Sequence, residues 1–207
     1  MFSRLYAIVD RASLEARGIS VRAFAEELRE AGVLLVQYRD KVSSPQEILR
    51  TTAEIASVFA GTETTLILND RADLAVLAGW DGVHVGQGDL TVEAARRVMG
   101  RGKFVGVSTH TEEQARVADE SAPDYIAVGP VFATGSKADA EAVIGLEGVR
   151  RMRALTSKPM IAIGGITRAN AASVMEAGVD AVAVIGDLLA AGERVEDVAR
   201  DFLRILG

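Results

Sequence analysis

Short hydrophobic runs recur along this chain, and each ends in polar residues or glycine. The stretch 33–41 reads VLLVQYRDK, so that an unbroken hydrophobic run leads directly into charged residues. Such a run is typical of a strand buried on both faces, as in a parallel sheet. Because the carboxyl ends of parallel strands meet at one edge, we expect a single site built there from several strands. The pattern recurs in LILND (66–70), VHVGQGD (83–89), FVGVSTH (104–110), YIAVGP (125–130), MIAIGG (160–165) and AVAVIG (181–186).

Segments with helical periodicity lie between these runs. A helix over 20–31 begins at a serine cap, another has Pro45 at its first position, and a third spans 91–100 and ends at glycine. With residues 5–9 as the first strand, about eight strand–helix units fit the chain. The alternation predicts an α/β fold, a (β/α)8 TIM barrel, formed by a single domain over 1–207.

Composition and charge narrow the functional classes. The chain of 207 residues contains no cysteine, which excludes disulfides and thiolate chemistry, and only two histidines, His84 and His110. We expect His84 to be a core residue, whereas His110 could reach the site. The formal charge of −6 argues against a nucleic-acid partner. No stretch approaches the ~18 apolar residues of a membrane span, and the amino terminus lacks a signal-peptide pattern, so we expect a cytoplasmic protein without a membrane partner.

One connection is much longer than the others. Residues 129–145 read GPVFATGSKADAEAVIG, and loops of this length usually act as lids or binding loops. The core of this loop, 134–137, offers two hydroxyl groups, backbone amides and one ammonium group, which together suit an oxyanion. A solvated turn is the alternative interpretation of these four residues.

Glycine-rich turns follow the last two predicted strands. Gly164 and Gly165 follow the seventh strand, and Gly186 follows the eighth. We expect the next helix to begin at Gly165 or Thr167, and a short helical segment to cover 188–191. Glycine lets a ligand approach the backbone, and helix amino termini bind anions. These two turns therefore predict a phosphate site, although tight turns alone would also need glycine.

Carboxylates and cations occupy the other strand ends. Asp70 and Asp89 each follow a hydrophobic run in adjacent units. Two oxygen ligands, completed by substrate phosphates and water, suit Mg²⁺. Either aspartate alone could instead cap the helix that follows it. Arg39, Lys41 and Lys137 form a positive set that could contact a second phosphate group.

The chain resembles the thiamine-phosphate synthase family (TenI superfamily) over nearly its whole length. The resemblance implies a (β/α)8 barrel that joins hydroxymethylpyrimidine diphosphate to carboxythiazole phosphate and releases thiamine phosphate, diphosphate and CO2. This chemistry needs no nucleophilic side chain, which agrees with the absence of cysteine. The resemblance depends on seven motifs in order: VQYRDK (36–41), ND (69–70), HVGQGD (84–89), GVSTHT (106–111), GPVFATGSK (129–137), AIGGI (162–166) and AVIG (183–186).

The resemblance also implies roles for individual residues. Asp70 and Asp89 would hold Mg²⁺. The groups implied in catalysis are Arg39, Lys41, Ser108 and Lys137. Those implied to contact the pyrimidine diphosphate are Gln37, Tyr38, Arg39, Asp40, Lys41, Asn69, Ser108 and Lys137. Those implied to contact the thiazole phosphate are Thr134, Gly135, Ser136, Gly164, Gly165, Ile185 and Gly186.

Three positions depart from the family pattern. Ala133 and Ser136 stand where the family usually has proline and threonine, and Gly186 stands where it often has serine. The glycine at position 186 removes a side-chain contact to phosphate but keeps the backbone N–H. Two other functions are compatible with the fold: a thiazole tautomerase-like isomerase, which would use a histidine near His110, and a non-catalytic phosphate-ligand binding protein. The residues implied for diphosphate favour the synthase.

Overall fold

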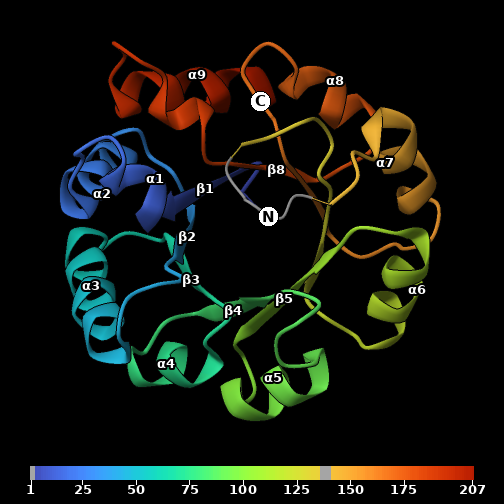
Figure 1. Ribbon diagram of the computed structural model, residues 1–207, viewed down its shortest axis with the longest axis horizontal. Coiled ribbons are helices and arrows are strands. Elements are labelled where there is room, and N and C mark those ends of the chain that lie inside the picture. The colour runs from blue at the N-terminus through green and yellow to red at the C-terminus, as the bar shows by residue number, and fades with distance from the viewer. Residues whose placement is uncertain (1–2, 136–140) are drawn as a thin grey trace.

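The computed structural model describes residues 3–135 and 141–207. Eight parallel strands form a closed barrel in chain order, and helices surround it (Figure 1). This confirms the predicted (β/α)8 TIM barrel. The strands are β1 (Leu5–Asp10), β2 (Leu35–Arg39), β3 (Thr65–Asn69), β4 (Gly82–Val85), β5 (Phe104–Thr109), β6 (Tyr125–Val128), β7 (Met160–Ile163) and β8 (Ala181–Val184). The helices are α1 (Arg11–Glu15), α2 (Val21–Glu30), α3 (Pro45–Val58), α4 (Ala72–Leu77), α5 (Val92–Met99), α6 (Glu112–Glu120), α7 (Gly145–Arg153), α8 (Ala171–Glu176), the 3-10 turn η1 (Asp187–Leu189) and α9 (Val195–Leu206).

Local sequence signals account for several helix boundaries. Ser20 and Thr91 cap α2 and α5 by accepting a hydrogen bond from a backbone N–H of the first turn, as predicted. Ser44 and Glu47 form a reciprocal capping box at the start of α3, with proline at the first helical position. Helix α1 was not predicted, and Asp10 caps it.

The strands separate two hydrophobic clusters, because successive side chains point to opposite faces. The larger cluster packs between the strands and the helices, and the smaller one fills the barrel interior. Tyr6 and Tyr125 are the largest side chains of the inner cluster, and both are fully buried. A Cβ atom on Gly106 would lie only 2.0 Å from the Tyr125 ring, so the absence of a side chain there makes room for that ring. The inner cluster fills the barrel, and the polar residues lie mainly beyond it, at the carboxyl ends of the strands.

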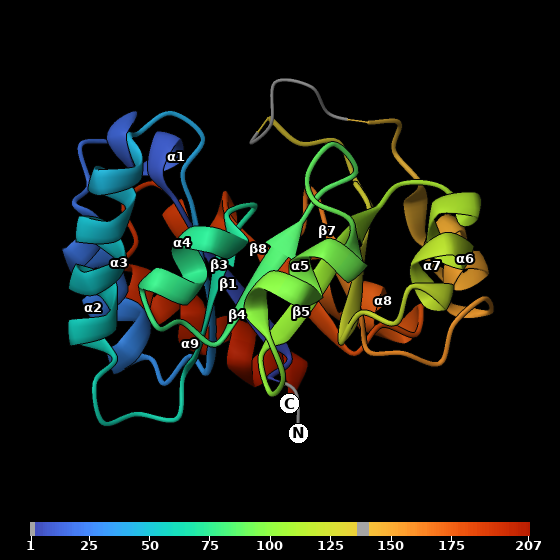
Figure 2. The same ribbon diagram turned by 90° about the horizontal axis from the view of Figure 1, so that it is seen from below.

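The connections that follow the strands gather at one end of the barrel. Figure 2 shows the barrel from the side, with α1 and the described parts of the β6–α7 connection at that same end. The long connection between β6 and α7 is where the sequence predicted it. No helix in the described parts of the chain is long and apolar enough to cross a membrane.

The segment after β7 differs from the sequence prediction. Helix α8 begins at Ala171 and not at Gly165 or Thr167. The Asn170 side chain explains the difference: its Oδ1 accepts from the Thr167 backbone N–H and its Nδ2 donates to the Gly165 carbonyl, which holds 165–170 as a turn. After β8, the helical turn begins at Asp187, one residue earlier than predicted.

Candidate active site

Two adjoining cavities open at the carboxyl end of the barrel. The first has a volume of about 470 Å³ and is lined mainly by residues from β1 to β5. The second has a volume of about 450 Å³ and is lined mainly by the connections after β6, β7 and β8. They share the side chains of His110, Ile163, Ala183 and Ile185 as a common wall. Ligands in the two cavities would therefore lie next to each other.

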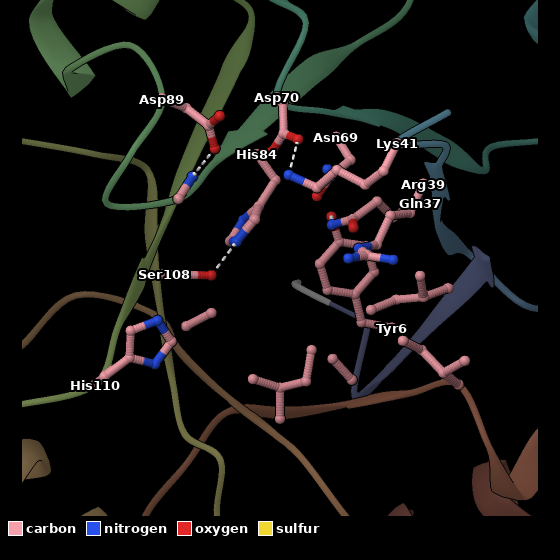
Figure 3. A pocket seen from close by; sticks show the side chains of 16 residues that line it. Tyr6, Gln37, Arg39, Lys41, Asn69, Asp70, His84, Asp89, Ser108 and His110 are labelled. Atoms are coloured by element: carbon pink, nitrogen blue, oxygen red, sulfur yellow. Dashed lines mark hydrogen bonds and ion pairs between the residues drawn. The ribbon is translucent and has the colours of Figure 1, made fainter. Parts of the chain in front are cut away.

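Polar side chains from four strand ends point into the first cavity (Figure 3). The sequence placed most of them in one site, and the structure brings them together. Those predicted residues are Gln37, Arg39, Lys41, Asn69, Asp70, Asp89 and Ser108. The histidine that was expected to reach the site, His110, lines both cavities.

Tyr38 and Asp40 do not line either cavity, contrary to the sequence-based expectation. Strand alternation explains this: Gln37 and Arg39 point into the barrel, whereas Tyr38 belongs to the cluster between strands and helices. The Tyr38 hydroxyl donates to Asp40 Oδ2 at 2.8 Å, and Asp40 Oδ1 accepts from the backbone N–H groups of Val42 and Ser43. Both side chains therefore support the loop after β2.

Each cation of the first cavity pairs with a carboxylate. Arg39 Nη1 donates to Asp10 Oδ1 at 2.6 Å, and the side chains of Arg39 and Asp10 are 15% and 2% exposed. Lys41 forms an ion pair with Asp70. The sequence assigned no role to Asp10, although it is the last residue of β1 and lies at the same ends of the strands as Asp70 and Asp89, and that parallel could have revealed it.

The two aspartates predicted to bind metal do not cap helices. Arg71 occupies the cap position of α4, and Thr91 caps α5 with its own side chain. Asp89 Oδ2 instead accepts from the Gly86 backbone N–H at 2.8 Å. Burial and the adjacent Asp89 carboxylate raise the pKa of Asp70, although the Lys41 ammonium opposes the shift. The helix-cap alternative is therefore wrong for both residues.

The carboxylate pair fits a hard divalent cation. Two neighbouring carboxylates at the cavity repel each other, and a cation between them would remove that repulsion. Within residues 3–135 and 141–207, no group of three or more histidine, aspartate or glutamate side chains could hold a metal. Mg²⁺ commonly uses one or two protein carboxylates together with substrate phosphates and water, so a two-carboxylate site agrees with it.

Asn69 and Ser108 are two further polar residues of the first cavity, and both are held in place by the surrounding fold. The Asn69 Nδ2 atom is buried and has no hydrogen-bond partner among the residues that the structure describes. A buried donor of this kind suits an anionic ligand oxygen. The Ser108 Oγ atom lies 2.8 Å from His84 Nε2, and the Gln87 side chain donates to the Ser108 carbonyl.

Five glycines line the second cavity together with apolar and polar side chains, including the carboxylates of Glu141 and Asp187. Of the residues predicted for the thiazole phosphate, Thr134, Gly135, Gly164, Gly165, Ile185 and Gly186 all line it. Ser136 and Lys137 lie outside the described residues. The helix amino terminus that was expected to follow Gly165 is absent there, because α8 starts later.

Comparisons with known proteins place the chain in a family. The family model described as thiamine monophosphate synthase matches residues 5–188. The chain belongs to this family. The thiamine-phosphate synthase of Koribacter versatilis is 51% identical over 205 residues, which cover 98% of this chain and 95% of that protein. The corresponding protein of Chloroflexus aurantiacus is 45% identical over 190 residues, covering 92% and 87%.

A solved structure extends the similarity to the fold. The thiamine phosphate pyrophosphorylase from Pyrococcus furiosus superposes with a TM-score of 0.87 at 29% identity, covering 99% of this chain and 95% of that one. By family, relatives and fold, the chain is an enzyme, a transferase of thiamine biosynthesis.

Two residues that line the first cavity of this thiamine monophosphate synthase family member were not placed in the site from the sequence. His84 was expected to be a core residue, and it is buried and hydrogen-bonded, yet it also lines the first cavity. Tyr6 lines the same cavity and was not predicted. Tyr6 could have been found from its spacing on β1. It precedes Ile8, which also lines the cavity, by two residues, and alternate residues of a barrel strand face the interior.

Proposed function

We propose that the two cavities hold the two substrates of a thiamine-phosphate synthase. The first binds hydroxymethylpyrimidine diphosphate, because it gathers cations and carboxylates. The second binds carboxythiazole phosphate, because its glycine-rich backbone lets a phosphate approach closely. The observation that carries the proposal is the wall shared by both cavities, formed in part by His110 and Ile163. It would place the reacting ends of the two substrates side by side, as a bimolecular coupling requires.

The basic residues of the first cavity bind the departing diphosphate in this proposal. Arg39 presents a guanidinium whose orientation Asp10 holds, and Lys41 lies within reach of the same space. Asn69 Nδ2 adds a buried donor. Lys137, outside the described residues, stays a sequence prediction. Donors fixed before the reaction stabilise developing charge without the cost of reorganisation.

Asp70 and Asp89 would hold Mg²⁺ at the edge of the first cavity. When bound there, the ion would neutralise charge on the diphosphate and so favour its departure. The protein residues bind and orient the substrates around this point. Gln37 lies beside Arg39 on the inner face of β2, where it can position the pyrimidine ring.

The coupling itself proceeds by dissociation in our proposal. The bond between the pyrimidine methylene carbon and the diphosphate oxygen breaks, and the diphosphate takes the electron pair. The resulting pyrimidine methyl cation is captured by the thiazole nitrogen, which forms the new C–N bond. The carboxylate leaves the thiazole ring as CO2, and the electron pair that it leaves behind takes up a proton. No side chain acts as a nucleophile. The enzyme holds the two rings together and excludes water from the cation.

The direct test is to incubate the protein with both substrates and Mg²⁺ and to measure thiamine phosphate and diphosphate. We expect both products in equal amounts. Rearrangement of the thiazole phosphate without coupling would identify a tautomerase, and binding without turnover would identify a non-catalytic protein.

The cytoplasmic location stays a prediction.

The glycines of the second cavity provide a separate prediction. Gly186 has a φ of −66°, which any residue can adopt. We expect Gly186→Ser to fold normally and to tighten thiazole phosphate binding by roughly 0.5–1.5 kcal/mol through one added hydrogen bond. Gly165 has a φ of 64°, and its Cβ would lie 2.5 Å from the Ala133 carbonyl oxygen, so Gly165→Ala should weaken binding. Calorimetry with thiazole phosphate measures both, and lost binding in Gly186→Ser would contradict a phosphate site after β8.

A further inference from the structure

A chain of buried hydrogen bonds crosses the barrel interior and ends at Ser108. Gln37 Nε2 donates to the Tyr6 hydroxyl at 2.7 Å, and the two tyrosine hydroxyls, Tyr6 and Tyr125, lie 2.9 Å apart. The Tyr125 hydroxyl lies 3.0 Å from His84 Nδ1, and His84 Nε2 lies 2.8 Å from Ser108 Oγ. All five side chains belong to buried residues, and they come from five different strands. The proposed synthase chemistry assigns no role to the two tyrosines or to His84.

One arrangement of the protons gives this chain a single direction toward Ser108. The amide nitrogen of Gln37 can only donate, so the Tyr6 oxygen accepts there, and in this arrangement the Tyr6 hydroxyl donates to Tyr125. Tyr125 then accepts that bond and directs its own proton to His84 Nδ1. A lone pair therefore occupies Nδ1, and the imidazole proton occupies Nε2. Nε2–H then donates to Ser108 Oγ, which leaves the Ser108 proton to donate to a ligand in the first cavity.

Two further observations concern the two tyrosines of this hydrogen-bond chain. Burial raises the pKa of both Tyr6 and Tyr125 above the usual range of tyrosine, so both hydroxyls keep their protons at neutral pH. The Tyr125 ring packs edge-on to Tyr6, with centroids 6.0 Å apart and an interplanar angle of 84°. It occupies the space that Gly106, in the GVSTHT motif, leaves open. Gly106 thus makes room for the second tyrosine of the chain.

We propose that Tyr6 and Tyr125 are positioning residues that hold His84 in its neutral Nε2–H tautomer and thereby make Ser108 a hydrogen-bond donor toward the bound pyrimidine diphosphate. The inference rests on the proposed function, which places that substrate against Ser108. A donor suits an anionic oxygen whose charge increases as the diphosphate departs. The protons of both tyrosines stay in place during the reaction, so their effect is on orientation. Figure 3 shows His84 directed at Ser108 beside the carboxylate pair.

The tautomer can be measured without any activity. The chain has two histidines, so ¹⁵N-histidine labelling produces two sets of ring signals, and a His110→Asn variant assigns them. At an alkaline pH where imidazole is neutral, we expect His84 of the wild-type protein to show a pyrrole-like Nε2 and a pyridine-like Nδ1. Tyr125→Phe keeps the ring but removes the donor, and it should shift the Nδ1 signal and mix the tautomers. Tyr6→Phe should cause the same change to a smaller extent.

Tyr38→Phe is the matched control for the spectrum. It removes the third and last tyrosine hydroxyl of the chain, from a residue on the outer face of the barrel, and should leave the His84 signals unchanged. In turnover, Tyr125→Phe should lower kcat on the order of 10- to 100-fold, as lost outer-shell partners commonly do, with a smaller change in KM.

Two results would overturn the proposal: an Nδ1–H tautomer of His84 in the wild-type protein, or a folded Tyr125→Phe variant with wild-type kcat. If Tyr125→Phe does not fold, the wild-type spectrum and Tyr6→Phe decide the same question. Failure of the proposed function would be distinguishable, because wild-type protein would then produce no thiamine phosphate while the His84 spectrum still reports the tautomer.

Discussion

Turnover is expected to fall by at least two orders of magnitude when Asp70 is replaced by asparagine, while the melting temperature barely changes. Asparagine cannot supply the charge that would hold Mg²⁺ on the diphosphate, so the leaving group would be poorly neutralised. The fold should tolerate the change for two reasons. Asp70 has a φ of 62°, a conformation that asparagine adopts readily, and the Lys41 side chain that would lose its partner is half-exposed.

Asp89→Asn provides the companion measurement. Its side chain can still accept the hydrogen bond from Gly86, so the turn should persist. Because both carboxylates would act through one ion, the Asp70→Asn/Asp89→Asn double variant should lose far less activity than the product of the two single effects. The Mg²⁺ concentration for half-maximal activity should rise in each single variant. A chelator should abolish turnover, and added Mg²⁺ should restore it.

Asp73→Asn is a matched control for charge. Asp73 lies in the first turn of α4, pairs with Arg71 on the surface and lines neither cavity, so the substitution should leave the Mg²⁺ dependence unchanged. Near-wild-type activity of Asp70→Asn or Asp89→Asn would contradict the metal site. Full activity in the chelator would contradict it as well.

Arg39→Met is expected to reduce both turnover and stability. The substitution removes a donor that would stabilise the departing diphosphate, which should lower kcat by a factor of roughly 10² to 10³. It also leaves the buried Asp10 carboxylate without its cation, and breaking a buried pair on one side costs about 3–5 kcal/mol. The melting temperature should therefore fall by about 6–20 °C for a chain of this size.

A second substitution separates the two effects. Asp10→Asn removes the unpaired charge and keeps an oxygen that can accept from the Ser13 backbone N–H at the start of α1. The Asp10→Asn/Arg39→Met variant should therefore regain most of the lost stability, as measured by urea unfolding, while its kcat stays low. Recovery of turnover together with stability would show that Arg39 acts only through the fold and not on the substrate.

Much of the barrel could be predicted from local sequence. The hydrophobic runs and the caps at Ser20, Ser44 and Thr91 depend on neighbouring residues, so they are readable along the chain. The rule that parallel strands present their carboxyl ends at one edge then brought Asp70 and Asp89 to the same site. The start of α8 could not be predicted from the glycines, because the Asn170 side chain competes with the helix for the backbone of 165–167.

Only the tertiary structure decided which groups touch. The sequence by itself determined the order of strands, the residue types at their ends and, through seven motifs, the family. The Arg39–Asp10 pair joins residues 29 positions apart, and the Tyr6–Tyr125 contact joins residues 119 positions apart. Such contacts depend on strand register and on the space left by residues such as Gly106, and no local pattern encodes either. The wall between the two cavities, and with it the juxtaposition of two substrates, arises only when the barrel closes.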